Sequence, residues 1–249
     1  MVKVVKVVKG MKSKQSCKSF FGTARTLLLA LAVCIPLSCM AKGGITVSGT
    51  RFIFPASATR ISVRIANTSD ADNYLIQSWV DDATGHKSGN FVVTPPLYLS
   101  KPDSENMLSL IRTGGSFPAD RETLFYLMVK AIPSVDDSSN TGQAVIHVAT
   151  VTQLKLFLRP SGLKPAPGEA PRRLTFSRTG SRLTVHNPTP YYLTLTHLSA
   201  GAKNLSDVMV SPLSSTTLPL PPGSGSVLTL RSINDYGGVS EPLTFSIHS

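Results

Sequence analysis

The sequence predicts an all-β protein built from two β-sandwich domains. Short extended segments recur along residues 45–247 with turn residues between them, and no stretch of the first half keeps an apolar period of 3.6 residues. Glycine and proline number 18 each, and runs of β-branched residues with serine or threonine are common. Spacing of this kind is typical of a sandwich of two antiparallel sheets.

The first sandwich is predicted over residues 42–160. Its expected strands are short apolar runs or segments in which apolar and polar residues alternate. In residues 60–66, Ile61, Val63 and Ile65 alternate with polar side chains, which indicates a strand with one buried face. The expected strands of this domain are residues 45–54, 60–66, 74–80, 91–93, 97–99, 107–111, 123–132 and 143–158.

A proline-rich segment separates this domain from a second one. Residues 161–171 contain Pro165, Pro167 and Pro171 with two glycines, a composition typical of a linker. A second, smaller β-sandwich is predicted over residues 172–249. Its expected strands are residues 173–176, 182–186, 191–197, 207–210, 226–231 and 243–247.

Residues 1–41 have the pattern of a cleaved export signal. A basic stretch precedes the apolar run 27–35, and small residues at 38–41 follow Pro36, so cleavage is expected after Ala41. The apolar run is too short to span a bilayer as a helix. A lipoprotein signal with lipidated Cys39 is the alternative, and Met11 is an alternative start. All three cysteines lie in this leader, so the mature chain is expected to have no disulfide and no thiol nucleophile.

Charge and motif content disfavour several functions. The formal net charge is +11, but the leader holds seven basic residues and no acid, which leaves 18 basic and 14 acidic residues in the body. A nucleic-acid partner is therefore not expected. The five histidines lack the spacing of metal ligands, and the sequence has no nucleophile elbow and no phosphate-binding loop. We predict no enzyme activity, no metal and no cofactor.

Residues 143–158 are unusually long for a strand of a sandwich and have apolar side chains on both faces. Ile146, Val148 and Leu154 share one face, and Val151 and Phe157 lie on the other. One face is expected in the core of the domain, so the second face requires a partner. An ordinary edge strand is the alternative.

Seven short motifs occur in order along the chain, at residues 50–51, 94–96, 118–126, 130–133, 154–160, 187–192 and 233–238. In this order they resemble the periplasmic pilus-assembly chaperones of the chaperone–usher pathway, and the resemblance extends over residues 45–249. It implies two immunoglobulin-like domains set at an angle, like a boomerang, and a chaperone that binds, folds and caps fimbrial subunits.

The resemblance implies a strand that is lent to the subunit. Its side chains in the groove of the subunit would be those of Ile146, Val148, Thr150 and Leu154. Thr150 departs from the family pattern, in which a bulkier apolar residue is usual, so a weaker contact is expected there.

Two basic residues match the cations that bind the C-terminal carboxylate of the subunit in this family. They are Arg51 and Lys155. The fork of an arginine and the point charge of a lysine together suit a chain terminus.

Glu122 and Asp235 match the acidic members of an inter-domain salt bridge of the family. Where the basic member is expected, near residues 107–111, this chain has Ser109. Arg112 is the predicted replacement, and an inter-domain angle held without this salt bridge is the alternative.

The partners that the resemblance implies are fimbrial subunits and an outer-membrane usher, in the periplasm. An exposed strand edge also predicts self-association of the free protein. The alternative function is a β-sandwich adhesion or structural subunit of the cell surface.

Overall fold

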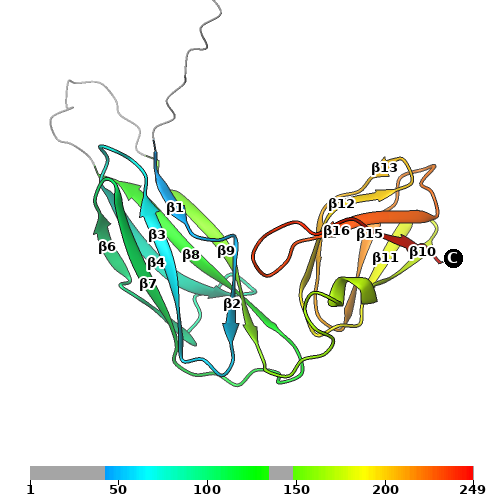
Figure 1. Ribbon diagram of the computed structural model, residues 1–249, viewed down its shortest axis with the longest axis horizontal. Coiled ribbons are helices and arrows are strands. Elements are labelled where there is room, and N and C mark those ends of the chain that lie inside the picture. The colour runs from blue at the N-terminus through cyan, green and yellow to red at the C-terminus, as the bar shows by residue number, and fades with distance from the viewer. Residues whose placement is uncertain (1–42, 135–147, 249) are drawn as a thin grey trace, which may run out of the picture. The chain divides into compact units, whose positions relative to one another are not determined.

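The computed structural model describes residues 43–134 and 148–248, and its regular structure is almost entirely β-strand, as predicted (Figure 1). Within these ranges the exception is one short 3₁₀ turn, η2 (Ala170–Arg173). No helix in these ranges has the length and apolar character needed to cross a membrane. The predicted leader lies outside the described residues.

The first sandwich consists of two sheets. One has the strand order β1-β3-β7-β5, and the other has the order β2-β9-β8-β4-β6. The strands are β1 (Ile45–Val47), β2 (Arg51–Pro55), β3 (Arg60–Asn67), β4 (Tyr74–Asp82), β5 (Phe91–Thr94), β6 (Leu97–Ser100), β7 (Ser104–Arg112), β8 (Thr123–Pro133) and β9 (Thr150–Arg159).

Side chains from both sheets form one core. On β3, Val63 and Ile65 are buried while Arg64 between them is exposed, as the alternation predicts. The ring of Phe91 makes edge-to-face contacts with Phe54 and Phe125, at centroid distances of 5.3 and 4.8 Å. Such contacts add to the free energy gained from burial of the rings. These aromatic contacts therefore help to hold the two sheets packed face to face.

The chain changes sheets within the first predicted strand. Residues 45–54 were expected to form one strand, but the strand is interrupted at Gly49, where φ is +126°. This backbone conformation favours glycine. β1 pairs antiparallel with β3 of one sheet, and β2 pairs parallel with β9 of the other. The expectation of purely antiparallel sheets was wrong here, and the parallel pair aligns Arg51 with Lys155.

The long strand expected over residues 143–158 is described as β9 from Thr150 onward. Leu156 and Leu158 are fully buried, whereas Thr150 and Thr152 on the same face are exposed. One face of β9 therefore belongs to the core in its second half and faces solvent in its first half.

The second sandwich also has two sheets around a separate core, which includes Leu183, Leu195 and Leu230. Strand β15 was not predicted because its sequence, SSTTLP, is mostly polar. One sheet contains β10 (Thr175–Thr179), β11 (Arg182–Asn187) and β15 (Ser214–Pro219), and the other contains β12 (Leu193–Ala200), β13 (Lys203–Asn204), β14 (Val208–Val210), β16 (Val227–Ser232) and β17 (Leu243–Ser246).

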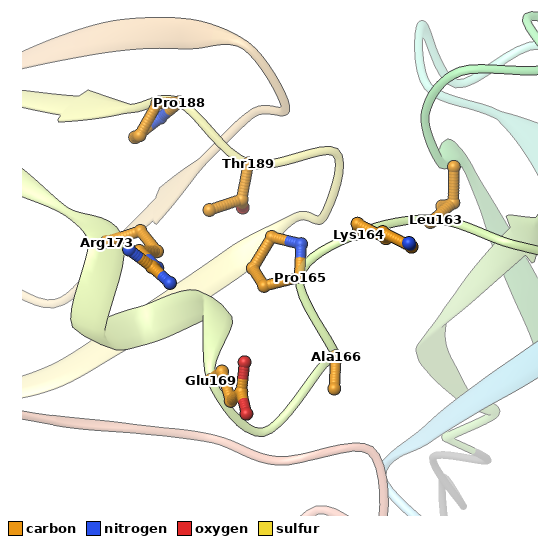
Figure 2. Close-up of a pocket in the computed structure, with 8 residues that line it drawn as sticks. All are labelled: Leu163, Lys164, Pro165, Ala166, Glu169, Arg173, Pro188 and Thr189. Atoms are coloured by element: carbon orange, nitrogen blue, oxygen red, sulfur yellow. The ribbon is translucent and has the colours of Figure 1, made fainter.

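The segment between the sandwiches packs on the second one. The hydroxyl of Tyr191 donates to the carbonyl oxygen of Pro165 at 2.9 Å, and Ala170 is fully buried in the second core. A surface pocket of about 780 Å³ lies at this segment, and Figure 2 shows the residues that line it. The pocket is lined by Leu163, Lys164, Pro165, Ala166, Glu169, Arg173, Pro188 and Thr189.

The limits predicted for the linker, residues 161–171, stay a prediction.

Candidate functional site

Arg51 and Lys155 lie side by side on neighbouring strands. The parallel register of β2 and β9 places them directly opposite each other, and such strands are about 4.8 Å apart. Arg51 is only 9% exposed and Lys155 is half-buried. The strand pairing therefore places two cationic side chains next to each other where both are at least half-buried.

Residues of the second sandwich hold these two side chains. Arg51 Nη1 donates to the carbonyl oxygen of Ile233 at 3.1 Å, and Lys155 Nζ donates to Thr194 Oγ1 at 3.3 Å. Among the described residues, neither cation forms an ion pair. Arg51 Nε is buried and has no hydrogen-bond partner there. Sequence reasoning missed Thr194 and Ile233, because no local motif marks a contact between distant strands.

The electrostatics of the pair favour an anion. Burial lowers the pKa of Arg51, and the carboxylates of Asp235 and Glu122 oppose this. Burial also lowers the pKa of Lys155, and the charge of Arg51 lowers it further. A carboxylate bound between the two groups would offset both their desolvation and their mutual repulsion.

Aromatic side chains support Arg51. Its guanidinium lies over the ring of Phe157, 6.0 Å from the centroid. Phe157 in turn stacks on Tyr192, with centroids 5.6 Å apart. These residues and Arg51 line a cavity of about 290 Å³, together with Leu193. Phe157 is buried and Tyr192 is half-buried, so the guanidinium packs against an ordered apolar surface.

A second arginine joins two acids close to this cavity. Arg159 Nε donates to Glu122 Oε1 at 2.7 Å. Its two terminal nitrogens donate to the carboxylate oxygens of Asp235 at 2.6 and 2.7 Å. The basic member of this group is Arg159, so the prediction of Arg112 was wrong.

The strand order explains this correction. Arg112 ends β7, in the sheet that does not contain β8 and β9, and Ser109 is paired with Ser62 there. Glu122 immediately precedes β8, and Arg159 ends the neighbouring β9. Because Thr123 pairs with Leu158, a correct β8–β9 register would have predicted the contact.

Glu122 is 3% exposed and depends on its neighbours for its charge. Its second oxygen accepts the backbone N–H of Tyr192 at 2.8 Å. Burial raises the pKa of Glu122, while Arg159 and the N–H of Tyr192 act in the opposite direction. Hydrogen bonds to Asp235 and the charge of Glu122 outweigh burial and raise the pKa of Arg159. Burial therefore prevails at Glu122, whose pKa is raised overall, and the two acids keep Arg159 protonated.

The residues expected to face a subunit have different environments. Val148 is 68% exposed, and Thr150 at the start of β9 is also exposed. Ile146 lies outside the described residues. Leu154 is 8% exposed and packs in the core of its own domain. Its assignment to the subunit contact was wrong, because the sandwich already covers this face at Leu154.

Together these features define a two-domain, all-β binding protein of the immunoglobulin-like class. The chain belongs to the family of pilus-assembly chaperones. Residues 44–164 match the pili and flagellar-assembly chaperone, PapD N-terminal domain, and residues 169–243 match the pili assembly chaperone PapD, C-terminal domain.

Relatives and solved structures support this membership. The chain is 42% identical to the probable fimbrial chaperone SfmC of Escherichia coli K12, over 86% of this chain and 93% of that protein. It is 42% identical to the chaperone protein FimC of the same strain, over 82% of this chain and 85% of FimC. The crystal structure of the periplasmic chaperone SfaE superposes with a TM-score of 0.72 at 39% identity, over 83% and 100% of the chains. The SafB chaperone, solved in complex with the Salmonella enterica SafA pilin, superposes with a TM-score of 0.74 at 31% identity. The match covers 82% of this chain and 96% of the SafB chain.

Proposed function

We propose that this chain is a periplasmic chaperone that binds fimbrial subunits, lends them a strand and delivers them to an outer-membrane usher. Its family and the SafB chaperone, which was solved with a pilin, support this function. The single observation that carries the proposed mechanism is the adjacent pair of Arg51 and Lys155, with a buried Nε that lacks a partner among the described residues.

In this mechanism the two cations bind the C-terminal carboxylate of the subunit. The guanidinium of Arg51 and the Nζ of Lys155 donate to the two carboxylate oxygens. Hydrogen bonds between charged groups are about twice as strong as neutral ones. The contacts to Ile233 and Thr194 hold both donors in place before binding, so little side-chain entropy is lost on association.

The anchored carboxylate also sets the register of the added strand. Lys155 lies on the same strand as Thr150, and Val148 precedes it. A subunit strand that ends at Lys155 can therefore run along the exposed first half of β9. A slip by one residue would turn every side chain to the wrong face. Backbone hydrogen bonds supply affinity for any sequence, and exposed side chains such as Val148 select the groove that fits.

Delivery then requires no nucleotide. The subunit leaves when it exchanges the lent strand for the better-fitting strand of a neighbouring subunit. Thr150 buries less apolar surface than a larger aliphatic side chain would. Its weaker contact favours that exchange.

The test is co-expression in the periplasm with a fimbrial subunit from the genome that encodes this chain. We expect a one-to-one complex with the wild type and none with Arg51→Ala or Lys155→Ala. Lys203→Ala, which removes an exposed cation of the second sandwich, is the matched control and should give wild-type recovery. Thermal unfolding of each free variant separates a binding defect from misfolding. Full recovery with both clamp variants would refute the mechanism.

A further inference from the structure

The loop that follows β16, red in Figure 1, presents one aromatic side chain to solvent. The Oδ1 atom of Asn234 accepts the backbone N–H groups of Tyr236 and Gly238 at 3.0 and 2.9 Å. The N–H of Asn234 donates to the carbonyl oxygen of Gly238 at 2.9 Å, which closes the turn. Tyr236 at its tip is 95% exposed.

The same loop is fixed to the first sandwich at several points. Asp235 forms two hydrogen bonds with Arg159, and the carbonyl oxygen of Ile233 accepts one from Arg51. Gly237 has φ of +84° and lies against Thr50, whose Oγ1 would collide with any Cβ at that position. Tyr236 precedes Gly237 in the chain, and Gly237 contacts Thr50, which precedes Arg51.

Tyr236 and Arg51 line the same cavity of about 290 Å³, so the exposed ring lies at the edge of the site that contains the arginine. An exposed tyrosine gains little from the fold of its own chain, since its apolar surface stays in water. Rigid tyrosines are enriched among the residues that dominate binding energy at protein interfaces. The backbone of the loop is already ordered by its contacts, so a partner would meet a preorganised surface.

We infer that Tyr236 is a binding residue for the last residues of the subunit, whose carboxylate lies on Arg51 and Lys155. Its ring packs against the side chain of the C-terminal residue and favours a large apolar or aromatic one. The inference rests on the proposed function and adds a side-chain preference to a site that otherwise recognises only a charge. A second copy of this chain is the competing occupant of the ring.

The test measures the dissociation rate of the purified complex with the fimbrial subunit used for co-expression. Labelled complex is chased with an excess of unlabelled wild-type chaperone. We expect Tyr236→Ala to dissociate about tenfold faster or more, and Tyr236→Phe to stay close to the wild type because the ring remains. Leu213→Ala, which shortens an exposed apolar side chain elsewhere in the second sandwich, is the control and should not change the rate.

A second measurement locates the contact. When the C-terminal residue of the subunit is replaced by glycine, Tyr236→Ala should change the rate by less than about twofold, because the two changes remove the same contact. An undiminished effect with this subunit would overturn the inference. So would a wild-type dissociation rate for Tyr236→Ala, or an effect confined to self-association of the free protein. If the wild type formed no complex, the proposed function would fail first and the inference with it.

Discussion

Arg51 begins strand β2 and Arg159 ends the neighbouring strand β9. The two arginines differ in how far the described residues satisfy their hydrogen-bond donors. Three nitrogens of Arg159 donate to carboxylates at 2.6–2.7 Å. Arg51 donates to one carbonyl oxygen and keeps a buried Nε without a partner among the described residues. Arg159 therefore stabilises the fold, and Arg51 is the residue that we propose binds the carboxylate of the subunit. Sequence identified both acids of the group but not the arginine between them, because the contact depends on register.

The lowered pKa of Lys155 predicts an unusual pH dependence of subunit binding. In the free chaperone, burial and Arg51 favour the neutral amine, whereas a bound carboxylate favours the ammonium. Affinity is therefore complete below the pKa of the free form and falls as the pH rises through it, and binding takes up protons there. Calorimetric titrations between about pH 7 and pH 10 should show this loss. Lys155→Arg, which stays charged throughout, should flatten the profile, and equal profiles would contradict the assignment.

At the scale of the element, β9 shows what alternation in a sequence can and cannot predict. The pattern correctly indicated a strand with apolar residues on both faces. It could not show that the covered half begins at Leu154, which is buried, while Thr150 on the same face is exposed. Coverage depends on how far the opposite sheet extends, which is a property of the whole domain. The switch of sheets at Gly49 and the polar strand β15 were missed for the same reason, since tertiary pairing overrides local pattern.

Two substitutions on β9 should separate folding from binding. Leu156→Ala removes a fully buried side chain and is expected to lower the free energy of unfolding by about 2–5 kcal/mol. Val148→Ala, at a position 68% exposed, should change it by less than about 0.5 kcal/mol but weaken the complex with the subunit. Urea unfolding of the free protein and recovery of the complex measure the two effects. Recovery of the complex at the wild-type level with a normally stable Val148→Ala variant would contradict the lent strand.

At the scale of the whole molecule, the described residues 43–134 and 148–248 belong to one compact unit that contains two separate hydrophobic cores. Arg159 and Glu122 come from the first sandwich, and Asp235 comes from the second. Arg51 and Lys155 also make their hydrogen bonds to residues of the second sandwich. The group around Arg159 therefore couples two cores that share no apolar cluster, and it does so beside the proposed carboxylate site.

Removal of Arg159 should weaken this coupling. Arg159→Ala leaves Glu122, which is 3% exposed, without its cation, and loss of one member of a buried pair costs about 3 kcal/mol or more. The loss of the Arg159–Asp235 pair should cost much less stability, because the side chain of Asp235 is 35% exposed.

The loss should also depend on pH. Burial already raises the pKa of Glu122, and without Arg159 that pKa rises further. The folded variant then binds a proton more readily than the unfolded chain, so its stability is retained below the ordinary glutamate pKa of 4.5 and falls as the pH increases through the raised one. Calorimetry should therefore show a larger deficit at pH 7 than near pH 4.5, with the two sandwiches unfolding in separate transitions. Arg121→Ala breaks an exposed pair with Asp120 and should unfold like the wild type at both pH values. A single wild-type transition in Arg159→Ala would show that the linker and the remaining contacts suffice to join the domains.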